Sequence, residues 1–281
     1  MAKTSFYNAD KGLHVDYSIN EKCNSTTYVS HFHEDYEIIF FFAVTGDYVV
    51  ENRKYTLGEN DVLLIKPTKY HYFIPQNESY YERIVINVVG DTLDGDLIPN
   101  AFSKGEFFHL EEGSTIAENF KKLKAYGSSL SPEHFSIMAK ALLTEIILLI
   151  NGLQGDHHND EYKYLDEFNT NVVKYINQNL PSITSLEQLA NDLFVSKSTL
   201  YHAFRRTMKI SIMQYVRNKK VLLAQSLIKN GVRPTKACAM SGFEDYTTFY
   251  RSYKLFFGHS PNDTSAVNSA TTNEALQDVK K

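Results

Sequence analysis

The chain has 281 residues, 43% of them hydrophobic and 13% aromatic, which is enough for two packed domains of ordinary size. Its two cysteines, Cys23 and Cys238, exclude a disulfide framework and a cysteine-based zinc motif, and they favour a reducing compartment. The formal net charge of −4 is unevenly distributed, because residues 171–261 carry 13 Lys and Arg against 4 Asp and Glu, whereas residues 1–170 carry 14 against 26. A basic segment beside an acidic one is typical of a nucleic-acid-binding module joined to a domain of another kind.

Residues 1–110 alternate aromatic and β-branched runs with turn residues. The runs cover 36–45, 48–51, 54–57, 62–65, 70–74 and 80–89, and Gly, Asn and Asp separate several of them. This pattern predicts an antiparallel β-barrel or sandwich.

The hydrophobic period becomes helical near Glu111. Ile116, Phe120 and Leu123 recur at helical spacing, and Ser131-Pro132 opens a second helix. The apolar stripe of that helix, over 139–150, is wide for one-sided packing, so we expect part of it to meet a second copy of the chain in a homodimer. This run and 38–44 are shorter than a membrane span, and the N-terminus has no apolar stretch of signal-peptide length. We therefore expect a cytoplasmic protein with no membrane partner.

Residues 151–163 are polar and contain Gly, which predicts a linker that includes His157 and His158. We expect a first domain over 1–150, a DNA-binding domain over 164–262 and a flexible tail over 263–281. The overall fold class is therefore multidomain α+β, with an all-α C-terminal domain.

The C-terminal domain contains the same helical pattern twice, offset by 48 residues at Ala190 and Cys238 and by 49 at Phe204 and Tyr253. Each copy predicts a short apolar helix, a tight turn and a second helix with a polar outer face, which is a helix-turn-helix. Ser185, Ser196 and Ser211 are expected N-caps. A long helix over 212–229 joins the copies and spans about 27 Å, close to the ~34 Å between successive major-groove faces.

The outer faces of the two second helices supply the candidate DNA contacts. Helical spacing from the inward-facing Phe204 and Phe249 selects Ser198, Tyr201, His202, Arg205, Thr247, Tyr250, Arg251 and Lys254. Arg251 is the best candidate for guanine, because its planar guanidinium matches O6 and N7 together. Lys254, Arg206 and Lys209 suit phosphates. The alternative to a DNA-binding domain is a helical bundle whose basic face is only solvated.

These residues carry a family resemblance. The segment Leu186–Phe204, the long middle helix and Gly242-Phe243-x-Asp245-x3-Phe249-x-Arg251-x2-Lys254 resemble the AraC/XylS family of transcription regulators. The resemblance implies that one monomer reads two adjacent major-groove segments and carries an N-terminal domain that senses a ligand and dimerises. The chain departs from the family's usual residues at Phe194, Lys209, Lys220 and Pro234.

A second resemblance concerns the N-terminal half. His31-Phe-His33-x3-Glu37 and Gly58-x8-Pro67-x3-His71 resemble the two motifs of the cupin barrel, whose His and Glu residues converge in metal-binding members. A polar pocket without a metal or cofactor is the favoured interpretation. The candidate effector-binding residues are His31, His33, Glu37, His71, Tyr36 and Tyr72, for a small polar ligand such as a sugar.

We therefore expect a non-enzymatic, ligand-responsive transcription regulator whose partners are double-stranded promoter DNA, a small-molecule effector, RNA polymerase and a second copy of itself. Three alternatives remain open. They are a metal-dependent cupin enzyme fused to a DNA-binding module, a DNA-repair alkyl acceptor that would need reactive cysteines, and a constitutive DNA binder whose barrel only dimerises.

Overall fold

The strands expected between residues 36 and 89 all form in the computed structural model, which describes residues 3–8, 12–23, 31–76, 79–153, 162–164 and 166–263. The chain divides into two compact units. The first comprises residues 1–28, 34–49 and 55–162, and the second comprises 29–33, 50–54 and 163–281. Most of the predicted linker and all but residue 263 of the predicted tail lie outside the described residues.

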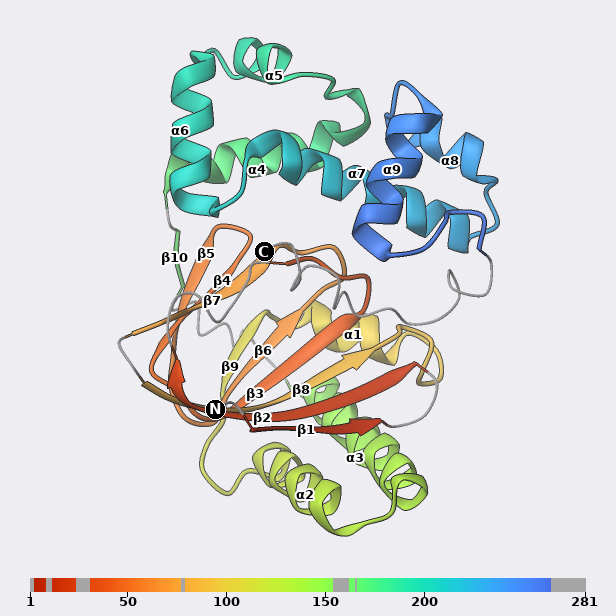
Figure 1. The fold of residues 1–281 in the computed structure, drawn as a ribbon. Coiled ribbons are helices and arrows are strands. Elements are labelled where there is room, and N and C mark those ends of the chain that lie inside the picture. Colours follow the sequence, from red (N-terminus) through yellow and green to blue (C-terminus); the bar gives the residue numbers. More distant parts are fainter. Residues whose placement is uncertain are drawn as a thin grey trace. The chain divides into compact units, whose positions relative to one another are not determined.

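The first unit is built on two β-sheets (Figure 1). The six-stranded sheet has the order β1-β2-β8-β3-β6-β9 and the four-stranded sheet the order β10-β5-β4-β7. The two sheets are not closed into one continuous barrel, so the fold is an open version of the predicted cupin-like architecture. The strands are β1 (Lys3–Asn8), β2 (Leu13–Cys23), β3 (Tyr36–Ala43), β4 (Gly46–Val50), β5 (Arg53–Leu57), β6 (Asp61–Ile65), β7 (His71–Pro75), β8 (Ser79–Val88), β9 (Phe107–His109) and β10 (Tyr162–Tyr164).

One face of the six-stranded sheet packs on helices. Because side chains alternate along a strand, Leu13, Val15 and Tyr17 of β2 lie on the same face and join a single hydrophobic core. The core also takes in residues of α1 (Leu97–Ser103), α2 (Thr115–Ser129) and α3 (Pro132–Gly152). The opposite face of this sheet is turned toward the second sheet, and the rings of Phe73 in β7 and Tyr81 in β8 stack at 4.6 Å between centroids.

Helix α3 begins as the sequence predicts, with Pro132 in its first turn and the Ser131 hydroxyl accepting a hydrogen bond from the backbone N–H of His134. By length and composition it is the one helix among the described residues that is long and apolar enough to cross a membrane. Much of its apolar surface, including Leu143 and Ile147, is instead buried within its own unit. The helix therefore serves as a core helix of this fold.

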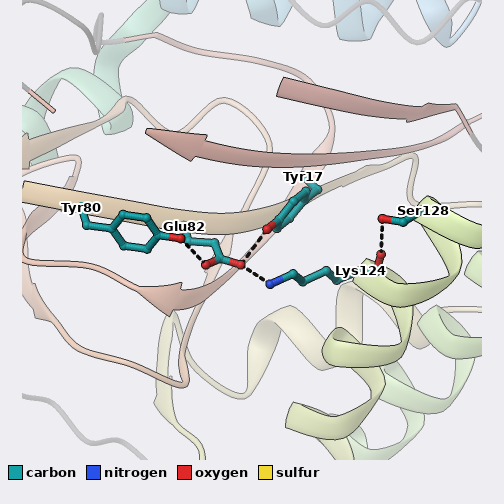
Figure 2. A network of polar contacts seen from close by, with 5 residues as sticks. All are labelled: Tyr17, Tyr80, Glu82, Lys124 and Ser128. Atoms are coloured by element: carbon teal, nitrogen blue, oxygen red, sulfur yellow. Dashed lines mark hydrogen bonds and ion pairs between the residues drawn. The ribbon is translucent and has the colours of Figure 1, made fainter. Parts of the chain in front are cut away.

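A polar network ties α2 to the sheet (Figure 2). The Glu82 carboxylate accepts hydrogen bonds from the hydroxyls of Tyr17 and Tyr80, each at 2.7 Å, and from the Lys124 ammonium of α2. Burial alone raises the pKa of Glu82, but the hydrogen bonds from Lys124, Tyr80 and Tyr17 outweigh it and leave the pKa below its usual value. The hydrogen bond to Glu82 also raises the pKa of Tyr80 to about 12. This network fixes the position of α2 beside β2 and β8.

The second unit is mostly helical. Its elements from residue 163 onward are α4 (Glu167–Asn179), the 3-10 turn η1 (Leu180–Ser182), α5 (Leu186–Asp192), α6 (Lys197–Met208), α7 (Ile212–Lys229), α8 (Pro234–Met240) and α9 (Tyr246–Phe257). The bounds of α7 are those predicted from the sequence. The turn segment 50–54 also packs in this unit, since buried Glu51 accepts hydrogen bonds from the Lys219 ammonium at 2.8 Å and from the Tyr215 hydroxyl.

Candidate effector site and nucleic-acid interface

Four of the six predicted effector-binding residues come together. His31, His33, Glu37 and His71 each offer one ligand atom, and these atoms all lie within 4.8 Å of one another. The Nε2 atom of His71 lies 3.1 Å from Oε2 of Glu37. Strand β3 of the six-stranded sheet carries Glu37 and strand β7 of the four-stranded sheet carries His71, and the ring of Tyr48 in β4 stacks on His71 at 6.1 Å between centroids.

The donor set suits a divalent metal ion. Nδ1 of His71 donates a hydrogen bond to the backbone oxygen of Lys69, 2.8 Å away, because a carbonyl oxygen can only accept. Imidazole nitrogen and carboxylate oxygen are both common metal ligands, so a divalent ion at this place would be held by His71 and Glu37 together. A backbone partner on the second ring nitrogen is also what metal-ligating histidines usually have. The residues present therefore fit the metal that cupin barrels hold.

The other two predicted residues, Tyr36 and Tyr72, do not join this group. Tyr36 precedes Glu37 in β3, so it lies on the opposite face of the sheet, where its ring contacts Phe102 of α1 at 4.8 Å. Tyr72 follows His71 in β7 and contacts Tyr70 at 5.9 Å. Burial raises the pKa of Tyr72 to about 12. Strand alternation separates both rings from the Glu37–His71 pair.

Sequence reasoning missed a set of polar residues on the same sheet face as Glu37. They are His14, Asp16 and Ser18 of β2 and Arg83 and Asn87 of β8. The available signal was their strict alternation with core residues in Leu13–Tyr17 and Ile84–Val88.

The first helix-turn-helix comprises α5 and α6, and local capping chemistry sets its boundaries. The Ser185 hydroxyl accepts from the backbone N–H of Gln188 at 3.1 Å, and the Ser196 hydroxyl accepts from that of Thr199 at 3.0 Å. Both expected caps are confirmed. Leu200 and Phe204 of α6 are fully buried, so the remaining faces of the helix are free to carry polar side chains.

The second helix-turn-helix comprises α8 and α9. Pro234 occupies the first turn of α8, where its missing N–H costs nothing, so this departure from the family's usual residue is compatible with the fold. Asp245 caps α9 by accepting from the backbone N–H of Thr248 at 2.8 Å, and this hydrogen bond is the largest contribution that lowers the pKa of Asp245. Phe249 and Tyr253 are buried.

Two turns of this unit keep a left-handed backbone without glycine. Phe194 has φ of 56° and Lys209 has φ of 60°, at two positions where the family often has Gly. Gly242 keeps glycine at φ of 83°. The turn geometry is therefore retained in all three places, with strain at the two that carry a Cβ.

Lys220 of α7 joins the two helix-turn-helix motifs. Its buried ammonium donates one hydrogen bond to the backbone oxygen of Ile183, before α5, and one to that of Gly242, in the second turn, both at 2.6 Å. Burial lowers the pKa of Lys220, and Glu244 partly opposes this. A single side chain thus fixes both motifs to the middle helix.

The predicted DNA-contacting residues all lie on accessible faces. In α6 and α9, Tyr201 and Tyr250 are half-buried, and the rest are exposed: Ser198, His202, Arg205, Arg206, Thr247, Arg251 and Lys254. The Arg205 guanidinium donates to the Tyr201 hydroxyl and lies over the Tyr201 ring. Two recognition-type helices therefore present basic and hydrogen-bonding side chains outward while their apolar sides form the core.

Comparison with known proteins matches both halves of the chain. A family model described as an AraC-like ligand binding domain matches residues 20–147, and one described as a helix-turn-helix domain matches residues 189–266. The Msm operon regulatory protein of Streptococcus mutans is 21% identical over 89% of this chain and 91% of its own length. The transcriptional activator RhaR of Escherichia coli is 20% identical over 96% of this chain and 97% of its own length. The solved structure of ToxT from Vibrio cholerae covers 94% of this chain and 99% of that protein at 14% identity, with a TM-score of 0.40. The chain therefore belongs to the AraC family of transcription regulators, with an AraC-like ligand-binding domain followed by a helix-turn-helix DNA-binding domain.

Proposed function

We propose that residues 164–262 bind promoter DNA through the outer faces of α6 and α9, and that residues 1–150 bind a small polar effector that controls this binding. The observation that supports the first part is the placement of the basic and polar side chains of α6 and α9, which are accessible while Phe204 and Phe249 are buried. The +9 charge excess of residues 171–261 supplies the attraction to phosphates.

Base readout is tested by comparing two neighbouring cations of α9. Arg251→Ala should cost on the order of 1–3 kcal/mol on the cognate site and relax the preference at one base position. Lys254→Ala should weaken all sequences about equally and reduce the salt slope by about one unit. Lys104→Ala, which removes an exposed cation at the C-terminus of α1, is the matched control.

Each variant is used to select bound DNA sequences from a randomised operator library, and the sequences that it prefers separate these two roles. A uniform loss of affinity with an unchanged preferred sequence in Arg251→Ala would remove that residue from the set of base readers. Salt-dependent DNA binding retained by a variant that lacks all the exposed cations of α6 and α9 would refute the assignment of the interface.

We propose that α3 also forms a homodimer interface, but through a different stripe from the one that the sequence suggested. Leu143 and Ile147 are buried in their own unit, whereas Ile137 and Leu148 are 68% and 50% exposed. Ala141 and Thr144 lie between Ile137 and Leu148 on the same face of the helix, at successive spacings of four, three and four residues. Such spacing is typical of the contact line between two packed helices, whether parallel or antiparallel. Ile137→Glu with Leu148→Glu should shift sedimentation toward the monomer, and Asn100→Glu on α1 should not. A folded double variant that stays dimeric would place the interface elsewhere.

We further propose that the protein acts in the cytoplasm without enzymatic activity and contacts RNA polymerase at its promoters. Its relatives that match over most of their length are operon regulators and transcriptional activators, which supports this assignment. Transcription from a reconstituted promoter, with and without the protein, tests the role directly and also distinguishes activation from repression.

The group of His31, His33, Glu37 and His71 favours a second candidate, a metal-dependent cupin enzyme fused to the DNA-binding module. In that case the four residues would hold the ion, and the ion would act as a Lewis acid toward a bound substrate. Metal analysis of the purified protein decides between the candidates. Stoichiometric iron, manganese or nickel that is lost in His71→Ala would favour the enzyme, whereas effector-dependent DNA binding without metal would favour the regulator.

A further inference from the structure

An open groove of 230 Å³ lies between the two helix-turn-helix motifs, inside the second unit. It is lined by the chain just before α5, by the first half of α7, and by the turn and first residues of α9. Figure 1 shows α7 passing from the α5–α6 motif to the α8–α9 motif. The volume is below the roughly 300–1,000 Å³ of typical small-molecule sites, so the groove suits a surface contact better than an enclosed ligand.

Two cations of α7 occupy this groove at different depths. Lys220 is buried, and its ammonium donates to the backbone oxygens of Ile183 and Gly242, so the two motifs meet at this residue. Arg217 lies three residues earlier, on the same face of α7, and its side chain is exposed. Arg217 is therefore at the mouth of the groove, above the point where the motifs meet.

The mouth of the groove opens beside the elements that are expected to contact DNA. Thr248, in the first turn of α9, lines the groove, and the candidate base reader Arg251 lies three residues later on the same side of the helix. Thr184, across the groove, comes directly before the N-cap of α5. The first helix of a helix-turn-helix crosses the DNA backbone, and helix N-termini commonly contact phosphates. The groove therefore opens toward the DNA that both motifs would bind.

The geometry of B-DNA determines what lies opposite this mouth. Two major-groove segments on one side of a duplex are ~34 Å apart, and the minor groove faces the same side about midway between them. Helix α7, which joins the motifs, is about 27 Å long. A side chain between the motifs thus faces a minor groove and not a third major-groove segment.

The guanidinium of Arg217 is available for such a contact. Within the part of the chain that the structure describes, it has no hydrogen-bond, ion-pair or ring partner. Its charged neighbours in the groove are Lys220, Glu244 and Asp245. Two cations and two carboxylates leave the groove without net charge, so it attracts a phosphate only weakly. The acceptors of the minor groove are uncharged base atoms, and a weakly hydrated guanidinium can donate to them at little desolvation cost.

We propose that Arg217 inserts into the minor groove between the two major-groove segments and makes the protein prefer A·T base pairs there. A·T tracts narrow the minor groove and strengthen its negative potential, which attracts arginine. They also lack the guanine 2-amino group that projects into this groove. The inference rests on the proposed function that α6 and α9 bind the major groove, and it adds to them a third contact that reads DNA shape.

Binding of the full-length protein to four operators tests the proposal. The segments read by α6 and α9 are kept constant, and the base pairs midway between them are A·T, G·C, inosine·C or 2,6-diaminopurine·T. Inosine·C combines the minor-groove edge of A·T with the major-groove edge of G·C, and diaminopurine·T does the reverse. We expect A·T and inosine·C centres to bind about equally. The G·C and diaminopurine·T centres should bind about fivefold more weakly or worse, which is the lower end of the effect of one wrong base pair.

Three variants assign this preference to a residue. Arg217→Ala should bind all four centres equally, and its melting temperature should be unchanged, because alanine suits an exposed position in the middle of a helix. Arg217→Lys keeps the charge and should keep the salt dependence while losing part of the preference. Arg233→Ala removes an exposed arginine that does not line the groove, and it should retain the full preference.

Two results would overturn the proposal. One is a central preference that follows the major-groove edge or persists in Arg217→Ala. The other is an equal loss at all four centres in Arg217→Ala with a salt slope reduced by about one unit, which would place Arg217 on a phosphate. In either case a flanking preference that is lost in Arg251→Ala would leave the proposed function intact. Affinity that depends on no base of the operator would refute both.

Discussion

The close approach at Gly242 gives a sharp test of how the two helix-turn-helix motifs are held together. A Cβ atom added there would lie 2.0 Å from the carbonyl oxygen of Pro181 and 2.6 Å from its carbonyl carbon. Both are backbone atoms, so no side-chain rotation relieves the overlap. Gly242→Ala must therefore push the second turn away from η1 and disturb the hydrogen bond from Lys220 to the Gly242 oxygen.

Two contributions set how much free energy of unfolding the Gly242→Ala variant should lose. A residue with a Cβ at φ of 83° costs about 1–2 kcal/mol in backbone strain. Forcing extra volume into a close-packed contact costs a further ~1–3 kcal/mol. Together they should lower the free energy of unfolding by about 2–5 kcal/mol. Gly258 has φ of 77° with nothing within 4 Å of an added Cβ, so Gly258→Ala should cost only the ~1–2 kcal/mol of strain.

Urea unfolding of the two full-length variants, followed by a probe of the helical unit, measures the difference directly. Promoter affinity should fall in Gly242→Ala, because α9 begins only four residues later and would move with the turn. Equal destabilisation of the two variants, within about 0.5 kcal/mol, would refute the backbone contact and the rigid connection inferred from it.

Three further predictions concern strain, pH and a buried ion pair. Phe194→Gly should stabilise the helical unit by about 0.5–1 kcal/mol, because it removes left-handed strain at a side chain that is 95% exposed, while Phe194→Ala, which keeps that strain, should gain nothing in thermal unfolding. Because the folded pKa of Glu82 lies below its unfolded value, the contribution of Glu82 to stability is present above about pH 4.3 and is lost as the pH falls through the folded pKa. In an acid titration, the Glu82→Gln variant should therefore lose less folding stability with falling pH than the parent protein does. Glu51→Gln should cost about 3–5 kcal/mol, since it leaves the Lys219 ammonium buried without its carboxylate, and Glu51→Gln combined with Lys219→Met should recover part of that loss; additive effects in a double-mutant cycle would contradict the pairing.

Local chemistry made several features of this protein predictable from the sequence. Ser185, Ser196 and Ser211 were identified as N-caps because a hydroxyl satisfies backbone N–H groups only three residues away. The bounds of α7 follow from the last of these caps and from Asn230-Gly231 at its other end. The outward positions of Arg251 and Lys254 follow from helical periodicity once Phe249 is assigned to the core.

What the sequence left open depends on which element covers each face. The alternation that placed Glu37 and His71 on one face also separates Tyr36 and Tyr72 from them, but only the tertiary structure shows which side of the sheet α1–α3 cover. The apolar stripe of α3 was visible in the sequence, yet only packing decides that Leu143 is internal and Ile137 exposed.

Pairings between residues far apart in the sequence are also decided only by the tertiary structure. Asp16 lies beside Asn87, and Lys220 bridges two carbonyl groups 59 positions apart, because of the register and crossing of whole elements. Caps and periodicity are determined within one or two turns of chain, where few conformations compete. Register, crossing and the covered face are set by the summed packing of all elements, and no short segment contains that information.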